Sequence, residues 1–508
     1  MDNTNYILFL DYTGWPAAKT SAEFFAPTAS ELLPEVTVGR SRSNRPELGR
    51  DFSFASRVWP AQKATINLIA SGLGIGLIVA PFQVMNCVSW ILFGVFSTLI
   101  AWRTLLILVG ILARWILPAS AIRPRRDEDL PIYSILVPAY QEAGLLQQTA
   151  QALRNLDWPV DKLDVQILLE ADDPETFAAA RQAEFPPHTR IVVVPPGGPK
   201  TKPNALNFGL AQARGQYLTV YDAEDIPIAN QLRVTFEQFQ AAPEKVVCLQ
   251  AALSGDNGSS SWLAAHWSLE YATQFGLLLP GLAVYRMPLL IGGTSNHFRK
   301  NALLALGGWD AWNVTEDADL GMRIARAGLL SSSCRTVTSE DGPTRFSDWL
   351  AQRSRWIKGY LQTWLVLMRD PCKTCKQMGA LRFCAMQLSL GGAILAPLLH
   401  GPVFLFVLII LASPDLTLSM PGKILLVAGL AVGFISDLVA PGSHTPSRAI
   451  ATLTRPLYWP LQTLAAYRAI WELAYAPFFW AKTPHHPRSP KATSPCSTGL
   501  LASVSPPP

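Results

Sequence analysis

Apolar residues in this chain form long runs on both sides of a more polar middle section. Before the middle section, two runs at roughly residues 64–85 and 88–117 are each long enough to cross about 30 Å of hydrocarbon as a helix. No Lys or Arg separates the runs, so they predict a transmembrane hairpin over residues 61–120. Arg103, inside the second run, must snorkel to the interface, face protein, or mark a shift in the limits of the span. Basic residues on both flanks place these flanks in the cytoplasm by the positive-inside rule: Arg40, Arg42, Arg45, Arg50, Arg57 and Lys63 before the hairpin, and Arg114, Arg123, Arg125 and Arg126 after it.

The apolar runs after the middle section predict further membrane helices over residues 381–482. Runs at about 384–411 and 423–440 are long enough to span a bilayer. A third run at about 456–479 contains prolines, an arginine, a glutamate and many aromatic residues. This third run therefore either crosses the membrane or lies in its interface.

The middle section, residues 127–380, alternates short runs of strand-forming residues with segments of helical spacing. This alternation predicts an α/β domain built on a mostly parallel sheet. In such sheets the ligand binds beyond the carboxyl ends of the strands. The expected strands are residues 133–138, 165–169, 190–194 and 216–221.

Composition supports a protein that lies partly in lipid, because 49% of the residues are hydrophobic and only 16% are charged. The formal net charge of +5 forms no long basic face, which argues against a nucleic-acid partner. The seven cysteines are scattered, and the CxxC pair Cys372 and Cys375 lacks further ligands at zinc spacing, so we expect ordinary thiols. Residues 1–60 and 483–508 lack sustained periodicity, which predicts disordered tails.

Acidic side chains follow the predicted strands at the edge where a ligand would bind: Glu142, Asp172, Asp173, Asp222, Glu224 and Asp225. Between them, a loop rich in Gly and Pro contains Lys200 and Lys202, which suit phosphate oxygens. Carboxylates that hold Mg²⁺ or Mn²⁺ beside such lysines describe a nucleotide-diphosphate site. Taken alone, an acidic DAED segment is more often a solvated turn or a helix start.

A second acidic segment, Thr315 to Asp317, opens another predicted helix. Its acids either serve a reaction or only stabilise the positive end of that helix. The polar loop 292–297 precedes this segment and could lie near an acceptor. Within the loop, His297 either contacts the acceptor or makes an ordinary structural hydrogen bond.

Three further polar side chains share one face of the next predicted helix, namely Gln352, Arg355 and Trp356. An indole can form a platform for a sugar ring, and a guanidinium can pair with a phosphate. The alternative is an amphipathic helix that lies on the membrane surface.

These motifs together resemble family-2 glycosyltransferases of the membrane-embedded, cellulose-synthase-like type. The matching pieces appear in the family's order: VPAYQE at 137–142, EADD at 170–173, KTKPNALN at 200–207, DAED at 222–225, TED at 315–317 and QRSRW at 352–356. TED followed by QxxRW is the specific part, since VPAYQE or DAED alone would be weak signals.

The resemblance implies a GT-A fold and a metal-dependent, inverting transfer of a sugar from a nucleotide sugar, usually a UDP-sugar, to a growing polysaccharide. It also implies a multi-pass protein of a bacterial inner membrane, with a cytoplasmic catalytic domain, a glycan or lipid acceptor and accessory secretion subunits. Two alternatives stay open, namely transfer of a single sugar to a lipid carrier and a non-catalytic scaffold role.

The roles implied by the resemblance follow its motifs. Asp317 would be the general base, and Asp222 would hold Mg²⁺ or Mn²⁺ together with Glu224 or Asp225, which are rivals for the second position. The remaining assignments are nucleotide-sugar contacts by Asp172, Asp173, Lys200, Lys202 and Asp222, and acceptor or diphosphate contacts by Gln352, Arg355 and Trp356.

Overall fold

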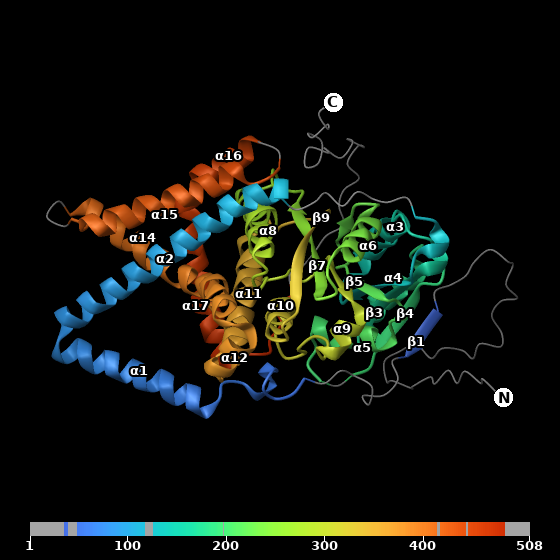
Figure 1. The fold of residues 1–508 in the computed structure, drawn as a ribbon, viewed down its shortest axis with the longest axis horizontal. Coiled ribbons are helices and arrows are strands. Elements are labelled where there is room, and N and C mark those ends of the chain that lie inside the picture. The colour runs from blue at the N-terminus through green and yellow to red at the C-terminus, as the bar shows by residue number, and fades with distance from the viewer. Residues whose placement is uncertain are drawn as a thin grey trace, which may run out of the picture.

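The computed structural model describes residues 48–116, 125–196, 198–413, 417–442 and 445–482, together with the backbone of 35–38. The predicted C-terminal tail and most of the predicted N-terminal tail lie outside these residues. Figure 1 shows an α/β domain at one end of the molecule and long helices at the other. The α/β domain flanked by apolar helices, as predicted, is therefore confirmed.

The described strands form one sheet in the order β1-β4-β3-β2-β5-β8-β7-β9-β6. All four strands expected from the sequence are present, with ends shifted by a few residues. The bounds are β1 Glu35–Val38, β2 Tyr133–Ala139, β3 Leu163–Glu170, β4 Arg190–Val194, β5 Tyr217–Val220, β6 Ile226–Pro227, β7 Val246–Gly255, β8 Asn296–Arg299 and β9 Leu330–Glu340.

The sheet is parallel in its first half and mixed in its second. Strands β1, β4, β3, β2 and β5 all pair in parallel. The short strand β8 then lies antiparallel to both β5 and β7. The prediction of a mostly parallel sheet is therefore right for the half that follows the alternating pattern. It missed β8 because the four residues Asn296 to Arg299 carry little apolar signal.

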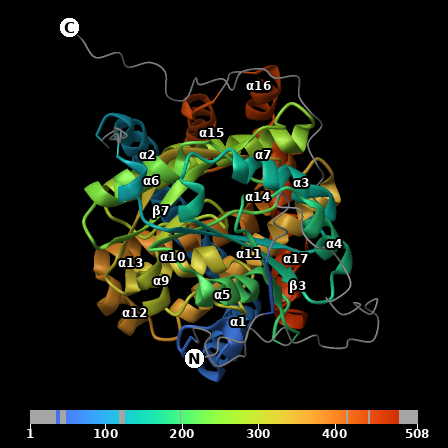
Figure 2. The same cartoon turned by 90° about the vertical axis from the view of Figure 1, so that its right-hand side faces the viewer.

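Helices cover both faces of the sheet, as Figure 2 shows. On one face α3 (Leu146–Arg154), α4 (Pro174–Gln182) and α6 (Gln231–Ala241) share a core with Ile135. On the other, α5 (Lys202–Gln212), α9 (Lys300–Ala305) and α10 (Glu316–Arg326) share a core with Leu136. Successive residues of β2 thus face opposite cores, which explains why its sequence is apolar throughout instead of alternating.

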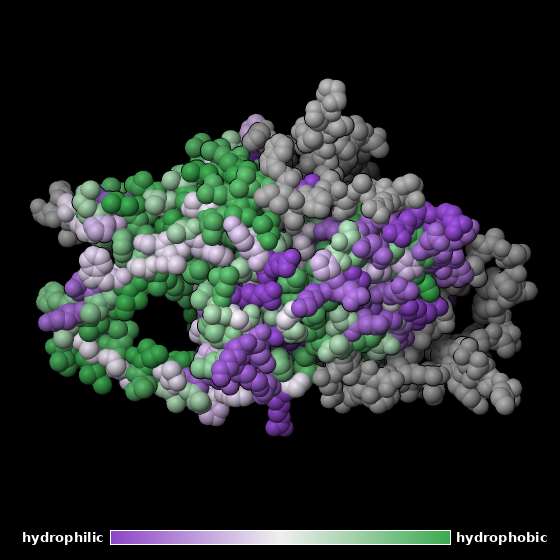
Figure 3. Space-filling view, viewed as in Figure 1, coloured by the Kyte–Doolittle hydropathy of each residue, from purple (hydrophilic) through white to green (hydrophobic). Residues whose placement is uncertain are grey.

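Four described helices are long and apolar enough to cross a membrane, and they form the green surface in Figure 3. They are α1 (Pro60–Val79), α2 (Pro81–Ile116), the continuous segment Ala380–Ala412 that contains α13 (Ala380–Met386) and α14 (Gly392–Ala412), and α15 (Met420–Val439). The far half of α2 continues onto the α/β domain, where Leu106 joins its core.

The turn of the first hairpin falls earlier than predicted. The sequence pattern put it between residues 85 and 88, whereas α1 ends at Val79 and α2 begins at Pro81. A proline cannot continue the preceding helix, because it lacks the N–H donor and restricts the residue before it, here Ala80. Arg103 faces protein, since its Nη2 donates to Ser436 Oγ of α15 at 3.4 Å.

The third C-terminal run forms α17 (Arg455–Tyr475), which is not among the four candidate spans. In Figure 1 it runs across the direction of α14 and α15, alongside α11. Its inner face holds a buried ion pair, with Lys358 Nζ of α11 2.8 Å from Glu472 Oε2. The other helices on this side are α7 (Trp262–Thr273), α8 (Leu279–Val284), α11 (Phe346–Leu367), α12 (Pro371–Met378) and α16 (Pro446–Leu453).

Candidate active site

Lys202 lies at the centre of the polar residues beyond the parallel strands. It begins α5, and its Nζ lies 2.5 Å from Asp222 Oδ1 and donates to the Gly293 carbonyl at 2.7 Å. Burial alone would lower the pKa of Lys202, but the carboxylates of Asp222 and Glu316 outweigh it and raise that pKa. The lysine therefore stays cationic and joins the β5 edge to the loop before β8.

The acids of the DAED turn after β5 differ in burial. Asp222 and Glu224 are half-buried, whereas Ala223 and Asp225 are buried. Asp225 Oδ2 accepts the Asp222 N–H at 2.7 Å and the Thr294 hydroxyl. Burial, followed by repulsion from Asp222 and Glu224, raises the pKa of Asp225. Asp225 thus holds the turn in shape, while Asp222 and Glu224 are more exposed.

Glu340, a fourth acid beside this turn, was missed by sequence reasoning. Strand β9 pairs antiparallel with β6 so that Ser339 faces Ile226, which brings Glu340 beside Asp225. Its Oε1 is buried and makes no hydrogen bond within the described part of the chain. Burial and then the Asp225 charge raise the pKa of Glu340. Only the strand pairing reveals this neighbour, because the two acids are far apart in sequence.

Asp317 lies across Gly293 from Lys202. Its Oδ1 accepts the Ala318 N–H at 2.8 Å at the start of α10. A methyl group added at Gly293 would lie 3.3 Å from Asp317 Oδ2 and 3.5 Å from Lys202 Nζ, so the missing side chain leaves space between the two charges. Burial raises the pKa of Asp317, and burial followed by the Asp317 charge raises the pKa of Glu316 to about 8.

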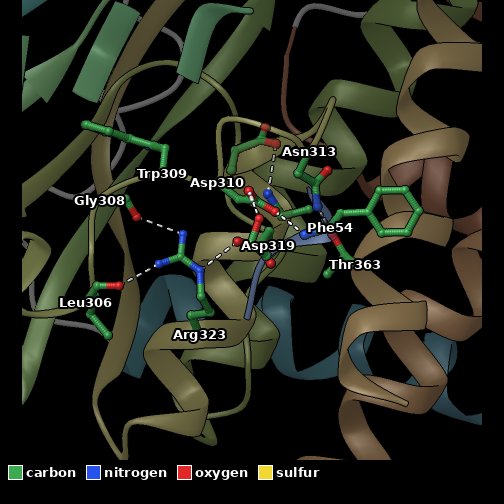
Figure 4. A network of polar contacts seen from close by, with 12 residues as sticks. Phe54, Leu306, Gly308, Trp309, Asp310, Asn313, Asp319, Arg323 and Thr363 are labelled. Atoms are coloured by element: carbon green, nitrogen blue, oxygen red, sulfur yellow. Dashed lines mark hydrogen bonds and ion pairs between the residues drawn. The ribbon is translucent and has the colours of Figure 1, made fainter. Parts of the chain in front are cut away.

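The segment before Asp317 is fixed by buried polar contacts, some of which Figure 4 shows. Asp310 accepts the Ser53 hydroxyl and the Phe54 N–H, both at 2.7 Å. Asn313 Nδ2 donates to Thr363 Oγ1 of α11 at 2.9 Å. Ser53 and Phe54, which the sequence pattern assigned to the disordered tail, are therefore buried against the segment before α10 and against Leu365 and Val366 of α11.

Arg323 supports the same segment from within α10. Its guanidinium donates to the carbonyls of Leu306 and Gly308, both at 2.8 Å, and to Asp319 Oδ2 at 2.7 Å (Figure 4). Helix α10 also approaches α11 closely, since a methyl group at Gly359 would meet Thr315 Oγ1 at 2.0 Å. The Asp317 carboxylate therefore lies at the start of α10, where α10 packs closely against α11.

Gln352, Arg355 and Trp356 all lie on α11, as predicted, but they have different neighbours. Gln352 accepts a hydrogen bond from Trp267 of α7 at 3.1 Å. The Trp356 ring lies under the Arg353 guanidinium, with 4.5 Å between Cζ and the ring centroid. Burial lowers the pKa of Arg355, opposed by the charges of Glu316, Asp317 and Asp222, so Arg355 belongs to the same electrostatic centre as Asp317.

The segment that follows α17 crosses this centre and was not predicted to do so. Trp480 lies over the Arg355 guanidinium, with 4.7 Å from Cζ to the ring centroid. Lys482 Nζ lies 3.2 Å from Glu142 Oε1, beyond the end of β2. Nothing in the local pattern of this aromatic and basic segment signals contacts with residues so distant in sequence.

The residues expected at the nucleotide fall into two groups. Asp172 and Lys200 form an exposed ion pair beyond β3. Asp173 instead caps α4 by accepting the Thr176 N–H at 3.1 Å, and it also accepts the Gln141 N–H. Asp173 therefore shapes the loop that ends β2, whereas Asp172 is accessible.

His297 takes the structural alternative. It is fully buried, its Nδ1 lies 2.7 Å from the Tyr133 hydroxyl, and its Nε2 lies 3.2 Å from Gln231 Oε1. Burial lowers the pKa of His297 to about 3, so the imidazole is neutral near pH 7. It faces the core of the sheet and is not oriented toward an acceptor.

The residues present fit a divalent cation that is shared with a ligand. Within the described residues, no three His, Cys, Asp or Glu side chains converge as a complete metal cage. Mg²⁺, however, is usually bound by one or two carboxylates together with substrate phosphates. Asp222 and Glu224, the half-buried acids of the turn, supply such a partial set of oxygen donors.

Acids and a buried lysine beyond the parallel strands of an α/β domain are an arrangement suited to a phosphate-bearing donor. Residues 131–359 match the model of the family described as "Glycosyltransferase like family 2". These residues therefore form a family-2 glycosyltransferase domain, as the sequence resemblance implied, and its mixed sheet is GT-A-like.

Three relatives illustrate how distant the similarity is. The chain is 26% identical over 236 residues to "Probable glycosyltransferase YdaM" of Bacillus subtilis, covering 46% of this chain and 56% of that protein. It is 28% identical over 246 residues to "Cellulose synthase 2" of Novacetimonas hansenii, covering 47% and 15%. It is 27% identical over 281 residues to "Beta-monoglucosyldiacylglycerol synthase" of a Synechocystis species, covering 53% and 57%. The chain thus spans less than two thirds of each relative's length.

A solved structure with a related outline is the mannosyltransferase PcManGT from Pyrobaculum calidifontis in complex with GDP-Man and Mn²⁺. It is 20% identical, covers 75% of this chain and 99% of its own, and superposes with a TM-score of 0.47.

Proposed function

We propose that this chain transfers a sugar from a nucleotide sugar, most simply a UDP-sugar, to a growing polysaccharide at the cytoplasmic face of a membrane. The observation that carries the proposal is the placement of the Asp317 carboxylate and the Lys202 ammonium beside the open space at Gly293. This arrangement brings a proton acceptor next to a cation that contacts the DAED turn. The four apolar helices would hold the site beside the membrane.

In this proposal Asp317 is the general base. Its carboxylate would accept the proton of the acceptor hydroxyl as that oxygen attacks the anomeric carbon of the donor. The leaving diphosphate departs from the opposite face, so a single displacement inverts the anomeric configuration. The raised pKa of Asp317 makes the carboxylate a stronger base than a solvated aspartate.

Cationic side chains would stabilise the diphosphate as its negative charge grows. Lys202 is buried beside Asp222, and Arg355 lies in the electrostatic field of the same acids. Asp222 and Glu224 would hold a Mg²⁺ or Mn²⁺ ion, which when bound supplies positive charge to the departing phosphate oxygens. We favour Glu224 over Asp225 for the second position, because Asp225 already holds the turn through Thr294.

The nucleotide would lie toward Asp172 and Lys200, beyond the carboxyl ends of β2 and β3. Both side chains are accessible, and their mutual ion pair could open to contact a ligand. Asp173 would act indirectly by fixing the backbone at Gln141. The acceptor would approach Trp356 and Gln352, which lie on the same helix α11 as Arg355.

Transfer of a single sugar to a membrane lipid is the second candidate. It is supported by a similarity to a relative named as a glycolipid synthase, 27% identical over 281 residues, that is about as strong as the similarity to one named as a cellulose synthase, 28% identical over 246 residues. The apolar helices beside the site would give a lipid acceptor direct access from the bilayer.

The test is a donor screen with the full chain reconstituted in lipid nanodiscs. Labelled UDP-glucose, UDP-N-acetylglucosamine, UDP-galactose and GDP-mannose would each be supplied with Mg²⁺ or Mn²⁺. Long product that stays in the aqueous or insoluble fraction supports polysaccharide synthesis, and label that extracts into organic solvent as a one-sugar lipid supports the second candidate. Absence of transfer from every donor would contradict the proposed function.

A further inference from the structure

Trp267 is a fully buried residue that joins α7 to the functional face of α11. Its side chain has no solvent exposure, and its Nε1–H donates to Gln352 Oε1 at 3.1 Å. The indole also stacks on Tyr271 of the same helix, with 3.8 Å between ring centroids and 25° between planes. Trp267 is thus the described hydrogen-bond partner of a residue expected to contact substrate.

The indole is clamped between two glycines, one at the end of β7 and one just beyond β9. A methyl group at Gly255, the last residue of β7, would lie 2.7 Å from Trp267 Cζ3. One at Gly342, just beyond β9, would lie 2.6 Å from Trp267 Cε3. Asn257 locks the two segments together, donating from Nδ2 to the Gly342 carbonyl at 2.7 Å and accepting the Gly342 N–H at 2.9 Å. The ring therefore has no room to rotate.

This clamp determines which way the Gln352 amide points. An indole nitrogen only donates, so the amide oxygen must face Trp267 and the NH₂ group must face away. Gln352 is 6% exposed, and its Nε2 makes no hydrogen bond to other described residues. Gln352 Nε2 is not among the fully buried unpaired atoms, so its two N–H donors can reach a ligand oxygen.

We propose that Trp267 is a positioning residue for sugar transfer, which fixes Gln352 so that its NH₂ group donates to an oxygen atom of the acceptor sugar or of the diphosphate. The inference rests on the proposed function for the identity of that ligand. The geometry of the clamp itself does not depend on that function. Both ligands present oxygen acceptors, and they can be distinguished by whether UDP binding changes.

The experiment is a double-mutant cycle with the full chain in nanodiscs. Trp267→Phe keeps an aromatic ring in the clamp but removes the N–H donor, and Gln352→Ala removes the amide. Trp364→Phe is the matched control, since Trp364 Nε1 donates to Gln387 Oε1 at 2.8 Å on the same α11 but outside the site. Initial transfer rate, UDP affinity and thermal unfolding are measured for each variant.

We expect Trp267→Phe to lower the transfer rate about tenfold, the size of effect that one hydrogen bond produces. In the Gln352→Ala background the same change should have little further effect, because the residues act as one unit. A fall in UDP affinity assigns the amide to the diphosphate, and unchanged UDP affinity assigns it to the acceptor. Trp364→Phe should stay within about twofold of wild type. Multiplicative losses from Trp267→Phe and Gln352→Ala, or no loss from Trp267→Phe, would overturn the inference.

A second measurement separates this inference from the proposed function and from misfolding. In protein with ¹⁵N-labelled indoles, Gln352→Leu should move one indole N–H resonance upfield, the one missing in Trp267→Phe. This shift requires no catalysis, so it tests the contact even if no nucleotide sugar is a substrate. An unchanged indole spectrum in Gln352→Leu would contradict the positioning role, whereas a failed donor screen would contradict only the proposed reaction.

Discussion

Lowering the pH should destabilise this protein through His297, and the effect can be calculated from its environment. The Nε2–H of His297 donates to Gln231 Oε1, which also accepts the Tyr221 hydroxyl, so Nδ1 is left to accept the Tyr133 hydroxyl proton. A second ring proton on Nδ1 would require the Tyr133 hydroxyl to turn its own proton away and accept instead. Burial accordingly lowers the pKa of His297 from 6.5 to about 3.

The sign and size follow from proton linkage. Between pH 3 and 6.5 the unfolded chain binds a proton at His297 that the folded chain does not, so the stabilisation is complete above pH 6.5 and is lost as pH falls. From pH 7.5 to pH 5 the folded state should lose about 2 kcal/mol at this residue, or roughly 1.4 kcal/mol for each pH unit below 6.5. His266, whose pKa burial also lowers to about 3, should add a similar loss.

The assay compares wild type with His297→Gln by denaturant unfolding at pH 7.5 and pH 5, followed by tryptophan fluorescence. Glutamine removes the titration, so the stability gap between the two proteins should shrink by about 2 kcal/mol at the lower pH. His188→Asn is the control, because His188 is exposed and its positive φ suits asparagine. A gap of equal size at both pH values would refute the reasoning, and a large rise in acceptor KM without loss of stability would restore the acceptor-contact alternative.

Three further changes test the site itself. Gly293→Ala should lower kcat at least tenfold with little change in thermal stability, because the added methyl group would lie 3.3 Å from Asp317 Oδ2. The control is Gly422→Ala, whose added methyl group would lie 3.3 Å from Ser419 Oγ, and equal activity in both variants would contradict the argument that the methyl group crowds Asp317. Lys202→Met should raise the KM for the nucleotide sugar about 10- to 100-fold, whereas Lys200→Met, at a side chain 63% exposed, should change that KM by less than about threefold. A larger rise in KM for Lys200→Met than for Lys202→Met would reject the placement of the diphosphate beside Lys202. Chelation by EDTA should stop transfer, and added Mn²⁺ should restore it. The Glu224→Gln variant should need roughly tenfold more Mn²⁺ for half-maximal transfer, and an unchanged Mn²⁺ requirement in this variant would assign the second metal position to Asp225.

The sequence predicted those parts of the fold whose signals are local. The runs that became β2 to β5 are apolar because they are buried on both faces, and the acids that follow them mark the ligand edge without any knowledge of packing. The helix that carries Gln352 and Trp356 was likewise readable from residue spacing. These predictions needed only neighbours within one element.

The parts that were missed depend on contacts between distant segments. Glu340 reaches the DAED turn only through the pairing of β9 with β6, and Trp480 reaches Arg355 only because the segment after α17 returns across α11. His297 lies next to site residues in sequence, yet the alternation of β8 turns it into the core. The role of His297 therefore depends on which face of β8 its side chain occupies, and the sequence pattern did not predict how β8 pairs with β5 and β7.

The central claim is that Asp317 is the base of a sugar-transfer site, and one measurement tests it most directly. Asp317→Asn keeps the shape of the side chain, including an oxygen that can accept the Ala318 N–H, but it cannot take a proton. With the donor identified by the screen, the initial transfer rate of this variant in nanodiscs should fall by roughly 100-fold or more, while UDP affinity and thermal stability stay near wild type. A transfer rate within about threefold of wild type would contradict the account.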